Sequence, residues 1–170
     1  GYGLSQAGVD RLVEEGCRLI ITVDCGVTAV EEVEYARSRG ADVIVIDHHT
    51  VGAELPNAVS VINPHRPDCE GNAQHLCAVG VVFNLLLALR RSLRSEGFFQ
   101  NRPEPDLKLA LDLVALGTVA EVGLNTRGIV QDKMASFGPD VHTSSWTRAG
   151  MPCVKHSSVE RKNREEIKQK

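Results

Sequence analysis

Three residues with metal-binding or proton-transferring side chains, Asp47, His48 and His49, follow directly after the apolar run of residues 42–46. An earlier apolar run ends in another acid, Asp24. Carboxylate oxygens and imidazole nitrogens bind Mn²⁺, Mg²⁺ or Zn²⁺, and hard oxygen donors favour the first two ions. These four side chains therefore predict a divalent-metal site, provided that the fold brings the two acids together.

Each part of this pattern also has a plainer interpretation. Asp24 lies two residues before Gly26, and a carboxylate at the end of a strand often serves as a turn former. The plainer interpretation of Asp47, His48 and His49 is a solvated loop. Successive side chains of an extended segment point in opposite directions, so the three cannot all face one metal while the strand continues. If the chain turns here, one imidazole can bind the metal, the other can face a substrate, and the acid can orient a ring.

The two apolar runs, residues 19–23 and 42–46, predict buried β-strands with a helix between them. Thr28 and Glu31 form a Thr-x-x-Glu capping box for this helix, which is expected to end near Gly40. Strands joined by a helix pair in parallel, and nearly continuous apolar strands indicate a sheet that is buried on both faces. The predicted fold class is α/β with a parallel, Rossmann-like sheet, in which ligands bind outside the carboxyl ends of the strands.

Further elements are indicated on both sides of this unit. Ser5 can cap a first helix, and residues 59–62 can form a short strand after a long connection. The apolar stretch 78–93 predicts a long helix. Another helix is expected over residues 107–116, with a break at Gly117.

The composition excludes several classes of protein. The chain has 170 residues, of which 42% are hydrophobic and 24% charged, so it can bury a core of its own. No apolar run reaches the length of a membrane span. Five cysteines, an odd number, suit a reducing cytoplasm better than a disulfide scaffold. The sequence contains neither a Gly-x-x-x-x-Gly-Lys loop nor a Gly-x-Gly-x-x-Gly motif, which argues against nucleotide motors and dehydrogenases.

The charge is distributed unevenly around a net value of −3. Residues 1–89 carry five Lys and Arg against twelve Asp and Glu, whereas residues 123–170 carry nine against five. An acidic first half suits a cation site. A polyanionic substrate would need the metal, or basic groups elsewhere, to offset the negative charge of this half.

A second set of possible metal ligands lies in the connection between the predicted strands and the long helix. It consists of His65, Cys69, His75 and Cys77. Their spacing lacks the Cys-x₂-Cys pair of a structural zinc site, so packing within the loop is the better interpretation.

Six short motifs of this chain occur together, and in this order, in one known superfamily. They are Gly-Tyr-Gly-Leu-Ser at residues 1–5, Ile-Thr-Val-Asp-Cys-Gly at 21–26, Asp-His-His at 47–49, Ile-Asn-Pro at 62–64, Ala-Val-Gly-Val-Val-Phe at 78–83 and Leu-Val-Ala-Leu-Gly-Thr-Val-Ala at 113–120. On these motifs the chain resembles the DHH phosphoesterase superfamily. The first and last motifs narrow the resemblance to the RecJ-like, single-stranded-DNA-specific exonucleases.

The resemblance implies hydrolysis of phosphodiester bonds by a pair of Mn²⁺ or Mg²⁺ ions, which activate water and bind the phosphoryl oxygens. By position, Asp24 is similar to the bridging carboxylate of the family and His48 to its metal-binding imidazole. Asp47 is implied as the partner that supports His48, and His49 as the group that contacts the scissile phosphate.

Two further residues have roles only through the resemblance. Glu121 stands where the family has an aspartate metal ligand, and its extra methylene moves the carboxylate by about one C–C bond, roughly 1.5 Å. Tyr2, which lies between two glycines, could stack on the bases of a DNA strand. Core packing is an equally good interpretation of Tyr2.

The resemblance also implies a domain organisation. Residues 1–122 are expected to be a DHH phosphoesterase domain that is incomplete at its N-terminal end, because the family's first Asp-x-Asp motif precedes the segment matched by residues 1–5. Residues 123–170 form an unassigned tail, either out of frame with the family or disordered. Because the first Asp motif is absent, the 170-residue chain itself is expected to be inactive.

The expected function is that of a fragment of a cytoplasmic 5′-to-3′ exonuclease, with single-stranded DNA as its partner and no membrane association, acting in DNA repair and recombination. Two alternatives remain open. The chain could belong to a DHH phosphoesterase for small substrates, namely pyrophosphate, a cyclic dinucleotide or short RNA. It could also be a non-catalytic DHH-like scaffold.

Overall fold

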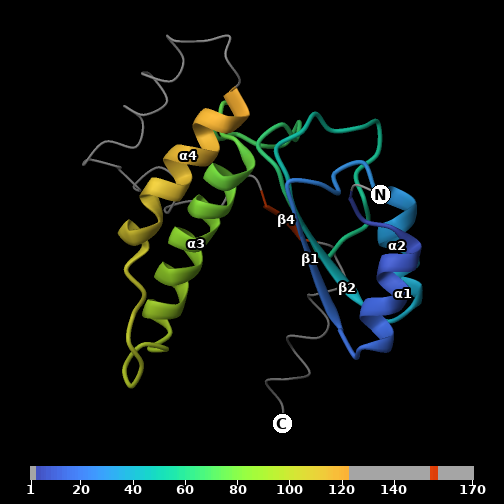
Figure 1. Ribbon diagram of the computed structural model, residues 1–170, viewed down its shortest axis with the longest axis horizontal. Coiled ribbons are helices and arrows are strands. Elements are labelled where there is room, and N and C mark those ends of the chain that lie inside the picture. The colour runs from blue at the N-terminus through green and yellow to red at the C-terminus, as the bar shows by residue number, and fades with distance from the viewer. Residues whose placement is uncertain (1–2, 123–153, 157–170) are drawn as a thin grey trace. The chain divides into compact units, whose positions relative to one another are not determined.

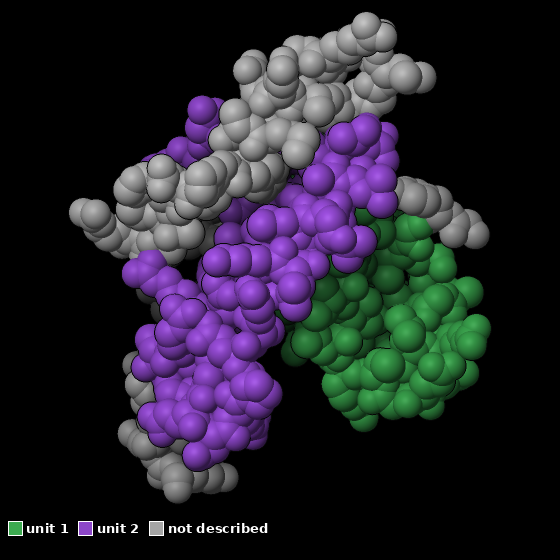
Figure 2. Space-filling view, turned by 60° about the vertical axis from the view of Figure 1, so that its left-hand side comes forward, with its two compact units in different colours: residues 1–69, 153–170 green, residues 70–152 purple. Residues whose placement is uncertain are grey.

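The computed structural model describes residues 3–122 and 154–156, which belong to two compact units. The first unit comprises Gly1–Cys69 and Cys153–Lys170, and the second comprises Glu70–Pro152 (Figure 2). Each unit has its own secondary structure, and each is described below by itself.

The first unit contains a four-stranded sheet in the order β1-β2-β3-β4. Strands β1 (Leu19–Val23), β2 (Asp42–Ile46) and β3 (Ser60–Ile62) are parallel, whereas β4 (Val154–His156) pairs antiparallel to β3. The α/β fold with a parallel sheet is therefore confirmed, and β1 and β2 have the predicted bounds. No strand was predicted at β4, because three residues are too few for an apolar pattern to be recognised.

Helices α1 (Gln6–Glu14) and α2 (Val30–Ser38) lie side by side on one face of this sheet (Figure 1). Their apolar side chains form one cluster with the strands, whose buried members are Val9, Ile20, Val27, Val33, Ala36, Ala41, Val43, Val45, Ala58 and Val61. On β1 the side chains alternate, so that Leu19, Ile21 and Val23 are about half exposed. The prediction of a sheet buried on both faces is therefore wrong for β1.

The starts of the two helices test the predicted caps. Ser5 caps α1 as expected, because its hydroxyl accepts a hydrogen bond from the N–H of Gly8 at 3.2 Å. The capping box at Thr28 and Glu31 is wrong, since α2 begins one residue later and has Ala29 at its N-cap, without a side-chain hydrogen bond. The spacing required by a capping box is lost when the helix starts one residue late.

The second unit contains a helical hairpin of α3 (Ala78–Ser95) and α4 (Leu111–Val122), with a 3₁₀ turn at Leu107–Ala110 leading into α4. The long helix predicted at residues 78–93 is confirmed. The predicted break at Gly117 is wrong, because α4 continues through this residue. None of the helices within residues 3–122 is long and apolar enough to cross a membrane.

Gly117 has a packing role in this hairpin. A Cβ atom at residue 117 would lie only 2.5 Å from Cγ1 of Val79 on α3. The next residue, Thr118, is buried and donates its hydroxyl to the carbonyl of Val114 at 2.7 Å, while its Oγ1 lies 3.3 Å from Sγ of Cys77. The Gly-Thr pair of this motif therefore allows α4 to approach α3 closely.

Gly117→Ala is expected to destabilise the second unit by roughly 1–3 kcal/mol, because the overpacking against Val79 outweighs the gain of about 1 kcal/mol in helix propensity. The matched control is Gly80→Ala on α3, where a Cβ would make an ordinary 3.4 Å contact with Leu76. Urea denaturation should show the control neutral or slightly stabilised. Equal stabilities of the two variants would contradict the packing role of Gly117.

Candidate metal centre

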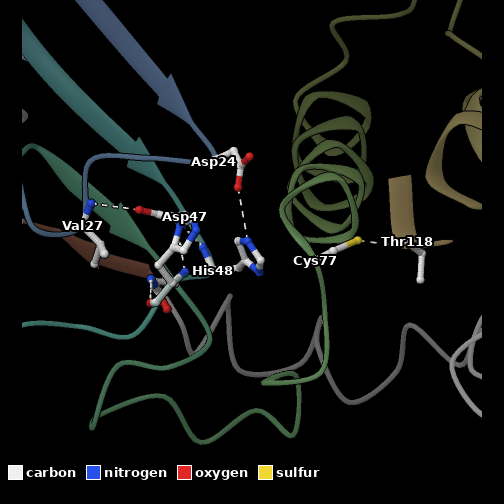
Figure 3. A network of polar contacts seen from close by, with 8 residues as sticks. Asp24, Val27, Asp47, His48, Cys77 and Thr118 are labelled. Carbon is white, nitrogen blue, oxygen red and sulfur yellow. Dashed lines mark hydrogen bonds and ion pairs between the residues drawn. The ribbon is translucent and has the colours of Figure 1, made fainter. Parts of the chain in front are cut away.

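Asp24 and Asp47 occupy equivalent places at the ends of neighbouring strands. The N–H of Asp24 donates to the carbonyl of Ile46 at 3.0 Å, and the N–H of Asp47 donates to the carbonyl of Ile62 at 3.0 Å. Each acid thus extends the parallel ladder by one residue before the chain turns away. Both carboxylates emerge at the same edge of the sheet, as the sequence predicted (Figure 3).

The turn after β1 has an unusual backbone. Asp24 has a φ of 62° and Gly26 a φ of 106°, so two residues out of three lie in the left-handed region. A Cβ at residue 26 would lie 2.7 Å from Oγ1 of Thr22, which leaves no room for a side chain. This tight turn places the N–H of Val27 where it donates to Oδ2 of Asp47 at 3.0 Å.

Asp24, His48 and His49 form a group with the spacing of metal ligands. One ligand atom of each lies within 4.8 Å of those of the other two. Oδ1 of Asp24 is 3.2 Å from Nε2 of His48 (Figure 3). Two ligands held about 2.1 Å from one octahedral ion, at a right angle, are about 3.0 Å apart, so this pair fits a shared divalent cation.

Asp47 lies behind this group and is 1% exposed. Its Oδ2 accepts the N–H of Val27, while Oδ1 accepts the backbone N–H of His48 at 2.8 Å and of His49 at 3.2 Å. Burial raises the pKa of this carboxyl, but the hydrogen bonds from Val27, His49 and His48 outweigh it, and the pKa lies below its usual value. Asp47 is therefore an ionised link between the turn after β1 and the turn after β2.

The ring that Asp47 contacts belongs to His49. Nδ1 of His49 lies 2.7 Å from Oδ1 of Asp47, and because that oxygen is an acceptor, Nδ1 carries the proton. In that tautomer the lone pair lies on Nε2 of His49. The resemblance implied support of His48 by Asp47, but the carboxylate reaches His48 at its backbone N–H and reaches a ring at His49.

Cys25 lies between the two left-handed turn positions and could be mistaken for a nucleophile. Burial, followed by the charges of Asp47 and Asp24, raises the pKa of its thiol. A thiol that stays protonated is a poor nucleophile. The raised pKa of Cys25 therefore argues against thiol chemistry in the turn after β1.

Asn63 is a residue of the site that sequence reasoning missed. It follows β3 directly, as Asp24 follows β1 and Asp47 follows β2, and it is fully buried. Its Nδ2 donates to the carbonyl of His49 at 2.9 Å. The signal that could have identified it is this shared position, the first polar residue after a buried strand.

The other predicted site residues lie outside this group. Glu121 is an exposed residue in the last turn of α4, in the second unit, whereas the metal-ligand group lies in the first. Tyr2 lies outside the described residues, as do residues 123–153 and 157–170 of the tail. In the part of the chain that the structure describes, Asp24, His48 and His49 are the one group with ligand spacing, and the Cys77 thiol is engaged with Thr118.

Comparisons with known proteins identify the family of this chain. The family model named DHH family, N-terminal domain, matches residues 3–118. The single-stranded-DNA-specific exonuclease RecJ of Escherichia coli (strain K12) is 51% identical over 124 residues, which cover 72% of this chain and 22% of that protein. RecJ of Bacillus subtilis (strain 168) is 38% identical over 122 residues, which cover 72% of this chain and 14% of that protein.

Two solved structures are similar as well. The crystal structure of RecJ in complex with Mn²⁺ from Thermus thermophilus has a TM-score of 0.53 and 35% identity, covering 77% of this chain and 19% of that one. A crystal structure of exonuclease RecJ bound to manganese has a TM-score of 0.57 and 30% identity, covering 89% of this chain and 38% of that one. This chain spans about a fifth of the length of the Escherichia coli relative.

Proposed function

The chain belongs to the DHH family, and on that premise we propose that it carries metal-binding residues of a single-stranded-DNA exonuclease. The enzyme hydrolyses phosphodiester bonds from the 5′ end, releases mononucleotides, and acts in the cytoplasm in DNA repair and recombination. The observation that carries the proposal is the group of Asp24, His48 and His49 at the strand ends, in a chain 51% identical to RecJ.

In this proposal Asp24 and His48 bind Mn²⁺ or Mg²⁺. Their 3.2 Å contact has the separation of neighbouring ligands, and the two atoms that make it, Oδ1 of Asp24 and Nε2 of His48, are buried. The role of Glu121 as a further metal ligand, which the resemblance implies, stays a prediction, because this residue belongs to the other unit. A divalent ion in such a centre lowers the pKa of a bound water and neutralises phosphoryl oxygens.

His49 and Asp47 act on the substrate side of the same centre. Asp47 holds the His49 ring at Nδ1, so that Nε2 is the ring atom presented to the scissile phosphate. Asp47 also keeps the two strand-end turns at a fixed separation through Val27. Tyr2 stacks on a base of the DNA strand.

The experiment measures cleavage by the complete polypeptide in which this sequence occurs. We expect Mn²⁺-dependent release of mononucleotides from 5′-labelled single-stranded DNA, no release in EDTA, and little cleavage of blunt duplex. Residues 1–170 alone should be inactive in the same assay, because the described residues of one unit supply only three clustered ligands. Faster hydrolysis of pyrophosphate, cyclic dinucleotides or short RNA would contradict the choice of substrate.

The charge of the first half favours small phosphates as a second candidate substrate. Residues 1–89 hold twelve acidic against five basic side chains. A long polyanion requires basic contacts along its backbone, whereas a small phosphate requires mainly the metal. The substrate panel separates the two candidates, and a protein that binds Mn²⁺ but cleaves none of these compounds would support a scaffold.

A further inference from the structure

A buried side-chain amide, that of Asn63 directly after β3, is hydrogen-bonded to the backbone of His49. Asn63 is fully buried, and it joins the turn after β2 to the turn after β3. Its Nδ2 donates to the carbonyl of His49 at 2.9 Å, and its Oδ1 accepts the N–H of His65 at 2.7 Å. We propose that Asn63 is a positioning residue that sets the direction of the His49 ring for the phosphate, an inference that rests on the proposed function.

The orientation of the Asn63 amide is determined by its two partners. The carbonyl of His49 can only accept a hydrogen bond, so the atom facing it must be the NH₂ group. The N–H of His65 can only donate, so the atom facing it must be the oxygen. A side-chain amide thus offers a donor on one side and an acceptor on the other without a charge.

His49 needs such fixation because its side chain is 53% exposed. Its ring contacts the His48 ring, with 4.6 Å between the centroids, and hydrogen bonds set its direction as well. Asp47 holds the ring at Nδ1 and the backbone at the N–H, on one side of the residue. Asn63 holds the carbonyl on the other side, and together the two bonds fix both peptide groups from which the ring extends.

A simpler role for Asn63 is that of a turn former. Its bond to the N–H of His65, two residues later, is that of an Asx-turn. Asn63→Asp separates the two roles, because a carboxylate retains the acceptor for His65 but cannot donate to His49. It also places an oxygen against the His49 carbonyl, where the amide made a 2.9 Å bond.

The test compares the kinetics and metal affinity of variants in the complete polypeptide in which this sequence occurs. Asn63→Asp should lower kcat on single-stranded DNA about 10–100-fold, the usual effect of losing a supporting contact, with KM changed less than about threefold. Mn²⁺ affinity, measured by calorimetry, should stay within about threefold of wild type, since Asp24 and His48 are untouched. Val9→Ala, on the buried face of α1, is the control that loses stability but retains kcat.

Asn63→Asp buries a charge, and this variant could fail to fold for that reason. Two further measurements keep the proposal testable in that case. Asn63→Ser is uncharged, and its hydroxyl can keep the turn bond to His65 but is too short to reach His49. It should show the same loss of kcat. In the wild-type protein labelled with ¹⁵N-asparagine, the Asn63 side-chain NH₂ should exchange slowly with solvent.

The outcomes separate this inference from the proposed function. A wild-type protein without Mn²⁺-dependent cleavage would overturn both. If wild type is active, an Asn63→Ser variant with the kcat of Val9→Ala, or a rapidly exchanging Asn63 amide, would overturn the positioning role alone. A loss of Mn²⁺ affinity as large as the loss of kcat would also overturn it, because Asn63 would then support the whole site rather than His49.

Discussion

Asp24→Asn is expected to lower Mn²⁺-dependent cleavage of single-stranded DNA roughly a thousandfold, which corresponds to about 4 kcal/mol of activation free energy. The carboxylate of Asp24 lies 3.2 Å from Nε2 of His48, and together they provide adjacent positions for one divalent ion. An amide retains the size of the side chain but loses its negative charge, and a neutral oxygen is a weaker ligand for a divalent cation. Mn²⁺ affinity should therefore fall at least about a hundredfold, more than for residues that only support a ligand.

The matched control for this substitution is Asp42→Asn. Asp42 is an exposed acid at the first position of β2, whereas the site lies beyond the last. The Asp42→Asn substitution changes the net charge of the same domain by the same amount as Asp24→Asn, so it controls for any general electrostatic effect. Wild-type Mn²⁺ affinity in Asp24→Asn, measured by calorimetry or by the EPR signal of free Mn²⁺, would show that Asp24 is not a ligand.

The positions of the site acids could be predicted because they depend on local sequence. β1 and β2 are five-residue apolar runs, each followed by an acid, and the helix between them requires parallel pairing. Parallel pairing then brings Asp24 and Asp47 to one edge. The donor types favoured Mn²⁺ or Mg²⁺ as the metal, whereas the two-metal centre and DNA as the substrate came from the resemblance of the motifs.

Three features of the structure could not be predicted from the sequence, because they depend on contacts that the local sequence does not show. Gly117 was expected to break a helix, because nothing in the sequence near it indicates that Val79 fills the space of its side chain. The ring that Asp47 contacts could not be derived from the sequence, since two adjacent imidazoles differ only in the direction that each takes from the turn. Asn63 was overlooked because its role requires the carbonyl of His49, which lies in the turn after another strand.

Asp47→Ala is expected to cause the largest loss of stability among substitutions in the first unit. The carboxylate accepts backbone N–H bonds from Val27, His48 and His49 and is 1% exposed. Removing it leaves three donors without their acceptor, each of which costs about 1–3 kcal/mol if no water replaces it. We expect a decrease in the free energy of unfolding of roughly 3–5 kcal/mol at pH 7, measured by urea denaturation in EDTA. Asp42→Ala should stay within about 0.5 kcal/mol of wild type.

The dependence of this loss on pH identifies the charge of Asp47 as its cause. The pKa of Asp47 is lowered in the folded state, so the folded protein binds its proton less readily than the unfolded chain does. The stability due to ionised Asp47 is therefore fully present above the ordinary aspartate pKa of about 3.9, and it is lost as the pH falls through the lower folded value. The difference between wild type and Asp47→Ala should stay constant from about pH 7 to pH 5 and narrow below about pH 4. A difference that widens towards low pH would mean that the Asp47 carboxyl is protonated in the folded protein. That result would contradict the role of ionised Asp47 in connecting the two turns.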